Sequence, residues 1–94
     1  MTKLDPTEIR SALASLPQWK QDGDVISRTF QFKDFPAAIR FVNTVADLAE
    51  KAWHHPDIDI RWNIVTLALT THDAGGLTGK DFELAKGFDA LSIR

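Results

Sequence analysis

The sequence predicts an α+β fold with the element order α-β-β-α-β-β-α, in which a four-stranded antiparallel sheet carries three helices on one face. Segments with apolar residues at helical spacing alternate with pairs of shorter segments in which apolar and polar residues alternate. Residues that can cap a helix precede the helical segments, and tight-turn residues separate the members of each pair. With 94 residues, the chain is expected to form one domain spanning residues 1–94.

The first helix is predicted from Asp5 to about Ser15. Asp5 can cap it, Pro6 suits the first helical position, and Glu8 stands where a capping box needs a carboxylate. Pro17 ends it.

The first strand pair is predicted on either side of Asp22-Gly23-Asp24, a sequence typical of a hairpin turn. Its arms are residues 19–21 and residues 25–32. Alternation in the second arm puts Ile26 and Phe30 on one face, which is expected to pack against helices.

The second helix is predicted from Asp34, its cap, to about Trp53. Its apolar residues cover about half of the helix circumference or more at about 100° per residue. A sheet alone usually covers less, so we expect part of this helix to contact another subunit. The alternative is that the helix packs between the sheet and another helix of the same chain.

The second strand pair is predicted at residues 58–62 and 65–72, with a tight turn at Asn63. His72 would then close the last strand. Residues 73–76 form a loop, and the third helix is predicted to begin near Thr78.

Composition excludes several classes of function. A net charge of −2 gives no electrostatic basis for binding nucleic acid, and without cysteine the chain has no disulfide, thiolate nucleophile or Cys-ligated zinc. No run approaches the roughly 18 apolar residues of a membrane span. The polar N-terminus lacks the apolar segment of a signal peptide, so a cytoplasmic location is expected.

All three histidines lie at the ends of predicted elements. His54 and His55 follow the long helix, His72 closes the last strand, and Asp81 lies at the start of the last helix. Ionisable side chains gathered at element ends predict one shared acid–base pocket, because histidine exchanges protons near neutral pH. Taken singly, each histidine could instead be an ordinary polar residue, since a histidinium suits a helix C-terminus.

Three other residues each allow two interpretations. Glu50 lies one helical turn before His54 and could fix its imidazole, or it could be a solvated surface charge. Asp81 could act in the pocket, or it could complete a capping box with Thr78. Trp19 could cover a flat ligand or belong to the core.

Metal and nucleophile chemistry have less support. Three histidines and a carboxylate could supply four zinc ligands, but the spacing lacks the His-x3-His pair of a helical metal site. No metal site is therefore predicted. No serine accompanies the histidines, and Gly75-Gly76 does not continue into a phosphate-binding glycine pattern.

At these residues the sequence resembles the pterin-4a-carbinolamine dehydratase family. The family signature is an acidic residue, three spacer residues, His-His-Pro, an aromatic residue, a second histidine and an aspartate. These positions are occupied here, without insertion, by Glu50, His54-His55-Pro56, Trp62, His72 and Asp81. Residues 30–35 and 69–77 are also similar to the family, so the resemblance covers nearly the whole chain from Trp19 to Leu91.

The resemblance implies a dehydratase that converts 4a-hydroxytetrahydropterin (the 4a-carbinolamine) to quinonoid dihydropterin and water by histidine acid–base catalysis, in recycling of the tetrahydrobiopterin cofactor. It implies no bound cofactor and no metal. It also implies the predicted fold and assembly into a homodimer or homotetramer through the helix from Asp34 to Trp53.

The resemblance also implies a catalytic set. His54 and His72 are expected to exchange protons with the 4a-hydroxyl and the ring, and His55 is expected to bind and polarise the pterin. Glu50 is expected to orient the pterin or a histidine.

The expected substrate-binding residues are Asp81, Trp19 and Pro56, with Asp81 holding His72 or its loop. Two alternatives remain open. One is a non-catalytic dimerisation or transcriptional cofactor module of the same fold. The other is a dehydratase for a related pterin, such as a molybdopterin-linked compound.

Overall fold

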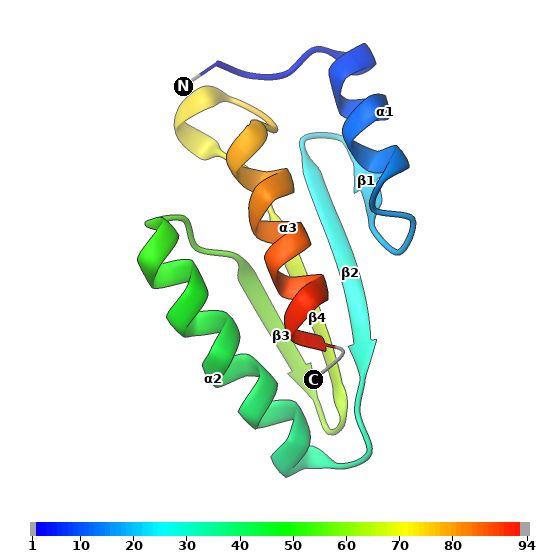
Figure 1. The fold of residues 1–94 in the computed structure, drawn as a ribbon, viewed down its shortest axis with the longest axis vertical. Helices are drawn as coiled ribbons and strands as arrows, with labels where there is room; N and C mark the ends of the chain where they lie inside the picture. Colours follow the sequence, from blue (N-terminus) through cyan, green and yellow to red (C-terminus); the bar gives the residue numbers. More distant parts are fainter. Residues whose placement is uncertain (1, 93–94) are drawn as a thin grey trace.

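The computed structural model describes residues 2–92 and has the predicted order of three helices and four strands (Figure 1). Met1 and residues 93–94, which the predicted domain includes, lie outside the described residues. The elements are α1 (Pro6–Ala14), β1 (Lys20–Asp22), β2 (Val25–Gln31), α2 (Phe35–Ala52), β3 (Asp57–Arg61), β4 (Ile64–Leu69), the 3-10 turn η1 (His72–Ala74) and α3 (Gly79–Ser92).

The four strands form one antiparallel sheet in the order β1-β2-β4-β3. In the register of β2 with β4, Phe30 pairs with Val65, and both are buried. The neighbouring pair, Thr29 and Thr66, points to the other face, where the two hydroxyls lie 3.0 Å apart at the surface. One face is therefore buried, and α1, α2 and α3 all contribute to its core through Ile9, Phe41 and Phe88.

The helix starts follow the predicted capping residues. Asp5 accepts the Glu8 N–H at 2.8 Å, and Glu8 accepts the Asp5 N–H at 3.0 Å, which completes the capping box of α1. Asp34 caps α2 by accepting the Ala37 N–H at 2.9 Å. Both predicted starts are confirmed.

The hairpin turns are also found where the sequence predicts them. Gly23, at φ 62°, and Asp24 connect β1 to β2. Asn63 forms the turn between β3 and β4, and its side-chain amide donates to the Phe32 carbonyl at 2.7 Å. The Phe32 N–H donates back to the Asn63 carbonyl at 2.9 Å, beyond the end of β2.

The prediction for the last strand was wrong at both ends. β4 begins at Ile64 and ends at Leu69, so it does not reach His72. Thr71 instead forms an isolated bridge with Gly76 through backbone bonds of 3.2 and 3.3 Å, and the chain between them makes the 3-10 turn. Alternation along the sequence does not reveal this bridge, because it depends on the chain folding back at Gly75, whose φ is 75°.

The long helix α2 lies along one edge of the molecule, beside α3 (Figure 1). Gly87 permits the close approach of α3, since a side chain there would come within 2.7 Å of Leu48. The face of α2 that this chain buries is formed by Ala38, Phe41, Val45 and Ala49. Ile39 and Val42 are only half-buried and Ala46 is exposed, so one flank of the apolar arc is not covered.

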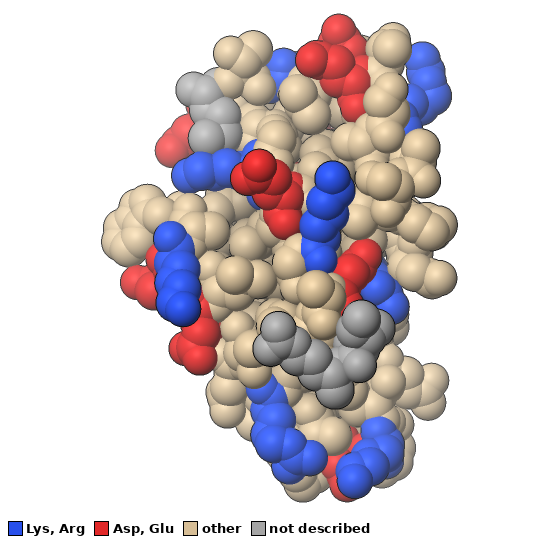
Figure 2. Space-filling view, viewed as in Figure 1, with Lys and Arg blue, Asp and Glu red and all other residues tan. Residues whose placement is uncertain are grey.

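Acidic and basic side chains are interspersed over the face of the molecule seen in Figure 2. That face has no continuous basic patch of the kind that binds a nucleic-acid backbone. Of the helices within residues 2–92, none has both the length and the apolar character needed to cross a lipid bilayer.

Candidate active site

The C-terminus of α2 turns sharply at Trp53, whose φ of 54° and ψ of 40° are left-handed. The Trp53 N–H donates to the Glu50 carbonyl at 3.1 Å, and the His54 N–H donates to the Ala49 carbonyl at 3.2 Å. This pair of bonds is a Schellman motif, which closes the helix, and Pro56 prevents the helix from resuming. Beyond this corner the two adjacent histidines reach different partners.

His54 contacts the start of α3. Its Nε2 lies 2.5 Å from Oδ1 of Asp81, and the side chains are 12% and 0% exposed. The other carboxylate oxygen of Asp81 accepts the Thr78 N–H at 2.9 Å and the Thr71 hydroxyl at 2.8 Å. Asp81 also lies in the first turn of α3, at the positive end of the helix dipole. The buried carboxylate therefore has the hydrogen-bond partners that a buried charge requires.

This arrangement revises the expected role of Asp81. The capping prediction is confirmed in part, because the carboxylate accepts the N–H of Thr78 immediately before α3. The reciprocal bond of a capping box is replaced, since the Asp81 N–H donates to the Thr78 carbonyl and the Thr78 hydroxyl contacts Thr71. It also holds the loop that carries His72, through Thr71 before the loop and Thr78 after it. The imidazole that it contacts is that of His54, however, and not that of His72.

His55 pairs with Glu50 on the surface of the corner. Its Nε2 lies 2.9 Å from Oε1 of Glu50, and the two side chains are 56% and 67% exposed. The expected contact of Glu50 with His54 was wrong, because the helix ends before residue 54 and helical i,i+4 geometry no longer applies. Such an exposed pair contributes about 0–1 kcal/mol to stability, so its main effect is to orient the ring of His55.

The three histidines line one pocket, as the sequence predicted. His72 begins η1 and is exposed, so its ring is open to solvent and to a ligand. The pocket has a volume of about 270 Å³. Its lining comes from the α2 corner and from the segment between β4 and α3, and consists of Trp53, His54, His55, Thr70, Thr71, His72 and Asp73.

None of the three residues expected to bind the substrate, Asp81, Trp19 and Pro56, is among the described residues that line this pocket, and neither is Glu50. Trp19 is 5% exposed and its Nε1 donates to Asp89 at 2.8 Å, with the ring edge-on to Phe30 at 6.3 Å. Its alternative interpretation, as a core residue, is therefore the one that the structure supports. Pro56 is half-buried beside the pocket-lining histidines. Its effect is on the backbone, which it keeps from continuing as a helix.

Thr71 is a site residue that was not predicted from the sequence. A signal was nevertheless present, because alternation places it on the same side as the buried Leu67 and Leu69. A hydroxyl at a core-facing position needs a buried partner, and here that partner is Asp81.

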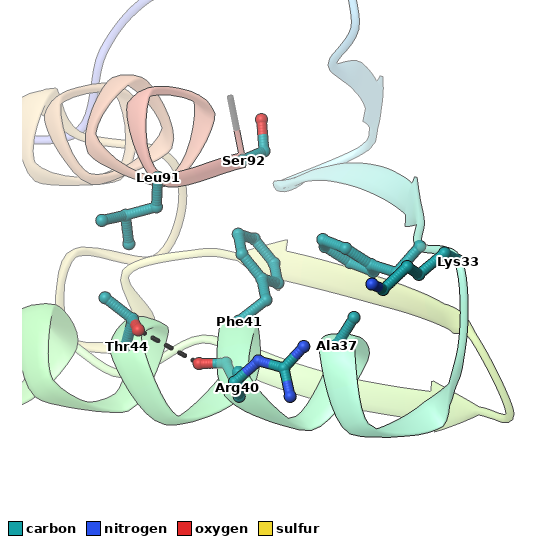
Figure 3. Close-up of a pocket in the computed structure, with 8 residues that line it drawn as sticks. Lys33, Ala37, Arg40, Phe41, Thr44, Leu91 and Ser92 are labelled. Carbon is teal, nitrogen blue, oxygen red and sulfur yellow. Dashed lines mark hydrogen bonds between the residues drawn. The ribbon is translucent and has the colours of Figure 1, made fainter. Parts of the chain in front are cut away.

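A larger hollow of about 420 Å³ lies between α2 and the end of α3 (Figure 3). Lys33 and Arg40 border it, Leu91 lies across from Phe41, and the Thr44 hydroxyl donates to the Arg40 carbonyl at 3.0 Å. Among the described residues that line it there is no histidine and no carboxylate, and so none of these side chains is suited to both donating and accepting a proton near neutral pH. The smaller histidine pocket is therefore the candidate active site.

Within residues 2–92, no three histidine or carboxylate side chains are grouped as ligands for one metal ion. Two of the histidine rings are instead engaged by carboxylates. Nε2 of His54 is engaged by Asp81, and Nε2 of His55 by Glu50, so these two rings do not converge on a common point through those atoms.

The chain is similar to proteins of one known family. The profile of the family described as Pterin 4 alpha carbinolamine dehydratase matches residues 2–91. The chain belongs to the pterin-4a-carbinolamine dehydratase family. It is 54% identical over 91 residues to a protein of Thermosynechococcus vestitus, which covers 97% of this chain and 96% of that protein. It is 58% identical over 90 residues to a protein of a Roseiflexus species, covering 96% and 97%.

Both of these dehydratase-family relatives are provisionally named as pterin-4-alpha-carbinolamine dehydratases. The fold also matches a solved structure, described as a transcriptional coactivator/pterin dehydratase from Brucella melitensis. That match has a TM-score of 0.93 and 34% sequence identity, and covers 97% of this chain and 99% of the other. The α+β architecture of this family member is therefore that of a solved pterin dehydratase.

Proposed function

We propose that this protein is a 4a-hydroxytetrahydrobiopterin dehydratase, a hydro-lyase that converts the 4a-carbinolamine to quinonoid dihydropterin and water. The observation that carries the proposal is the convergence of three histidines on one pocket of about 270 Å³, in a chain of this family. The pocket is open on one side, where the exposed His72 can meet a ligand.

The reaction requires two proton transfers and no change in oxidation state. A carbinolamine carries a hydroxyl and a nitrogen on the same carbon. The C–O bond breaks as the hydroxyl leaves as water, which requires an acid, and the nitrogen loses a proton to a base as the C=N bond forms. Histidine can serve in either role near neutral pH, and each such group typically contributes about 10²–10⁴-fold to the rate.

The contacts support a division of roles among the histidines. His54 is held against a buried carboxylate, and His72 lies across the same pocket in the turn after β4. These two exchange the protons of the hydroxyl and the ring. His55, oriented by Glu50, binds and polarises the pterin.

Replacing His54 and His72 together with alanine tests the proposal. We expect the rate of quinonoid dihydropterin formation, followed by stopped-flow absorbance from freshly generated 4a-hydroxytetrahydropterin, to fall to that of the uncatalysed reaction. Circular dichroism should show an intact fold, because His72 is exposed and because Asp81 keeps the Thr71 hydroxyl and the Thr78 N–H as hydrogen-bond donors when the His54 ring is removed. The matched control, Arg40→Ala in the larger hollow, should keep full activity. Unchanged turnover in the double variant would end the assignment.

The identity of the pterin is a separate question. A panel of 4a-hydroxypterins with different side chains tests whether the tetrahydrobiopterin compound is preferred over a related pterin. A protein that turns over none of them, and instead binds a macromolecule tightly, would support the non-catalytic cofactor module.

The uncovered flank of α2 supports self-association. Ile39 and Val42 are half-buried and Ala46 is exposed in the single chain, and all three lie on one flank at about 100° per residue. We propose that this flank of the helix, within the segment from Asp34 to Trp53, forms the contact of a homodimer or homotetramer.

A further inference from the structure

We propose that Thr71 and Thr78 are positioning residues that act on His54 through Asp81. Together they hold the imidazole of His54 with its proton on Nε2, so that Nδ1 is the proton acceptor offered to the pocket. The catalytic part of this inference deepens the proposed function and rests on it. The position of the proton on His54 can be tested without any substrate.

The direction of the hydrogen bonds follows from counting protons. The Thr71 hydroxyl has one proton, which it donates to Oδ2 of Asp81 at 2.8 Å. Oγ1 of Thr78 lies 2.9 Å from Oγ1 of Thr71, and because the Thr71 proton is already used, Thr78 is the donor in that bond. The Thr78 N–H also donates to Oδ2 of Asp81, at 2.9 Å.

These donors hold Asp81 as an acceptor. Its Oδ2 receives two hydrogen bonds, and its position in the first turn of α3 favours a negative charge. Its Oδ1, at 2.5 Å from Nε2 of His54, is then left to accept a proton from that ring. The second neighbour of Nε2, Oγ1 of Thr71 at 3.5 Å, has already donated its own proton and can also only accept. Every contact of Nε2 therefore favours a proton on that atom.

With the proton on Nε2, the other ring nitrogen of His54, Nδ1, is unprotonated. Within residues 2–92, no hydrogen bond engages Nδ1, and the ring is one of those that line the pocket. A neutral imidazole with its proton on Nε2 has its lone pair on Nδ1, so His54 is the base that takes the ring proton. His72 is then the acid that protonates the departing hydroxyl.

The hydrogen bonds of Asp81 with Thr71 and Thr78 also fix the position of the acid, His72. Thr71 immediately precedes His72, and Thr78 follows the loop that begins at His72. Thr78 and Asp81, at 0% exposure, lie behind the pocket, whereas Thr71 is buried but contributes to the pocket lining. The buried carboxylate of Asp81 thus positions the base, His54, directly. It also positions the segment that carries the acid, His72, by holding both ends of that segment.

Nitrogen-15 NMR of the histidine rings tests the inference, because the two nitrogens of a neutral imidazole give different shifts when protonated and unprotonated. In the wild-type protein without ligand, at a pH where the rings are neutral, we expect His54 to carry its proton on Nε2. Variants His55→Asn and His72→Asn assign its signals. In Thr71→Val, which removes the hydroxyl at nearly constant size, we expect a mixture of the two tautomers. We expect kcat to fall by about 10- to 100-fold with KM changed by less than about twofold, because a base is weakened and binding is not.

Two further variants separate positioning from folding. Thr71→Ser keeps the hydroxyl and should restore the wild-type tautomer and most of kcat. Thr29→Val removes a threonine hydroxyl on the open face of the sheet and should change neither. A wild-type spectrum with the His54 proton on Nδ1 would overturn the inference, even if Thr71→Val does not fold. So would a folded Thr71→Val with an unchanged tautomer. A protein that turns over no pterin but shows the expected tautomers would overturn the proposed function and leave the network standing.

Discussion

Two tryptophans in this chain have a left-handed backbone. Trp53 has φ 54° and is 73% exposed, and Trp62 has φ 52° and is 66% exposed. This conformation costs a residue with a side chain about 1–2 kcal/mol, and glycine or asparagine usually occupies it. Trp62 lies in the turn after β3, whereas Trp53 lines the histidine pocket with its ring edge-on to His55 at 5.9 Å. A strained, exposed aromatic side chain at a pocket indicates a role in binding a flat ligand.

Replacing Trp53 with asparagine should therefore separate stability from binding. We expect the free energy of unfolding in urea to rise by about 0.5–1 kcal/mol, because asparagine tolerates the left-handed conformation. We expect KM for the pterin to rise about tenfold, as when a ring contact worth about 1.4 kcal/mol is removed.

Trp62→Asn is the matched control for this substitution. It relieves the same kind of strain outside the set of pocket-lining residues, so it should stabilise the protein and leave KM unchanged. An equal change of KM in both variants would show that Trp53 has no special contact with the substrate.

At the scale of the elements, the predictable features are those with local causes. Asp5, Asp34 and Thr78 mark helix starts because a cap involves residues within one turn of each other. The end of β4 could not be predicted in this way, since it depends on the bridge between Thr71 and Gly76.

The candidate site was predictable only in part for the same reason. The ends of elements indicated that the three histidines would meet. The partner of each ring was not evident, because the contact of His54 with Asp81 joins residues 27 positions apart. The hydrogen bond of Trp19 to Asp89 likewise joins residues 70 positions apart.

The cap of α2 gives a test at this scale. Asp34→Ala removes the acceptor of the Ala37 N–H and should lower the free energy of unfolding by about 0.5–2 kcal/mol. Because the cap lies at the opposite end of α2 from the histidines, kcat and KM at 25 °C should not change. Asp47→Ala, at an exposed position within the helix, should change stability by less than about 0.5 kcal/mol. A loss of turnover in Asp34→Ala with the fold intact would show that the site depends on the whole length of α2.

For the whole molecule, the uncovered flank of α2 predicts how copies of the chain assemble. Ala46→Glu places a charge at an exposed position on this flank, where it would be buried and unpaired between subunits. We expect sedimentation equilibrium to show at least about a tenfold increase in the dissociation constant, corresponding to about 1.4 kcal/mol. Thr44→Glu adds the same charge to an exposed position about 160° around the helix from Ala46 and should leave assembly unchanged. A wild-type protein that stays monomeric at high concentration would contradict the assembly proposal.

The proposed chemistry requires a single bound pterin to reach all three histidines. A crystal structure with a non-reactive reduced pterin analogue measures this directly. We expect the pterin ring beside Trp53, within hydrogen-bonding distance of His55, and between Nδ1 of His54 and the ring of His72. A ring bound in the hollow between Lys33 and Arg40, or bound near the α2 corner but out of reach of His72, would contradict the proposed catalytic role of the three histidines.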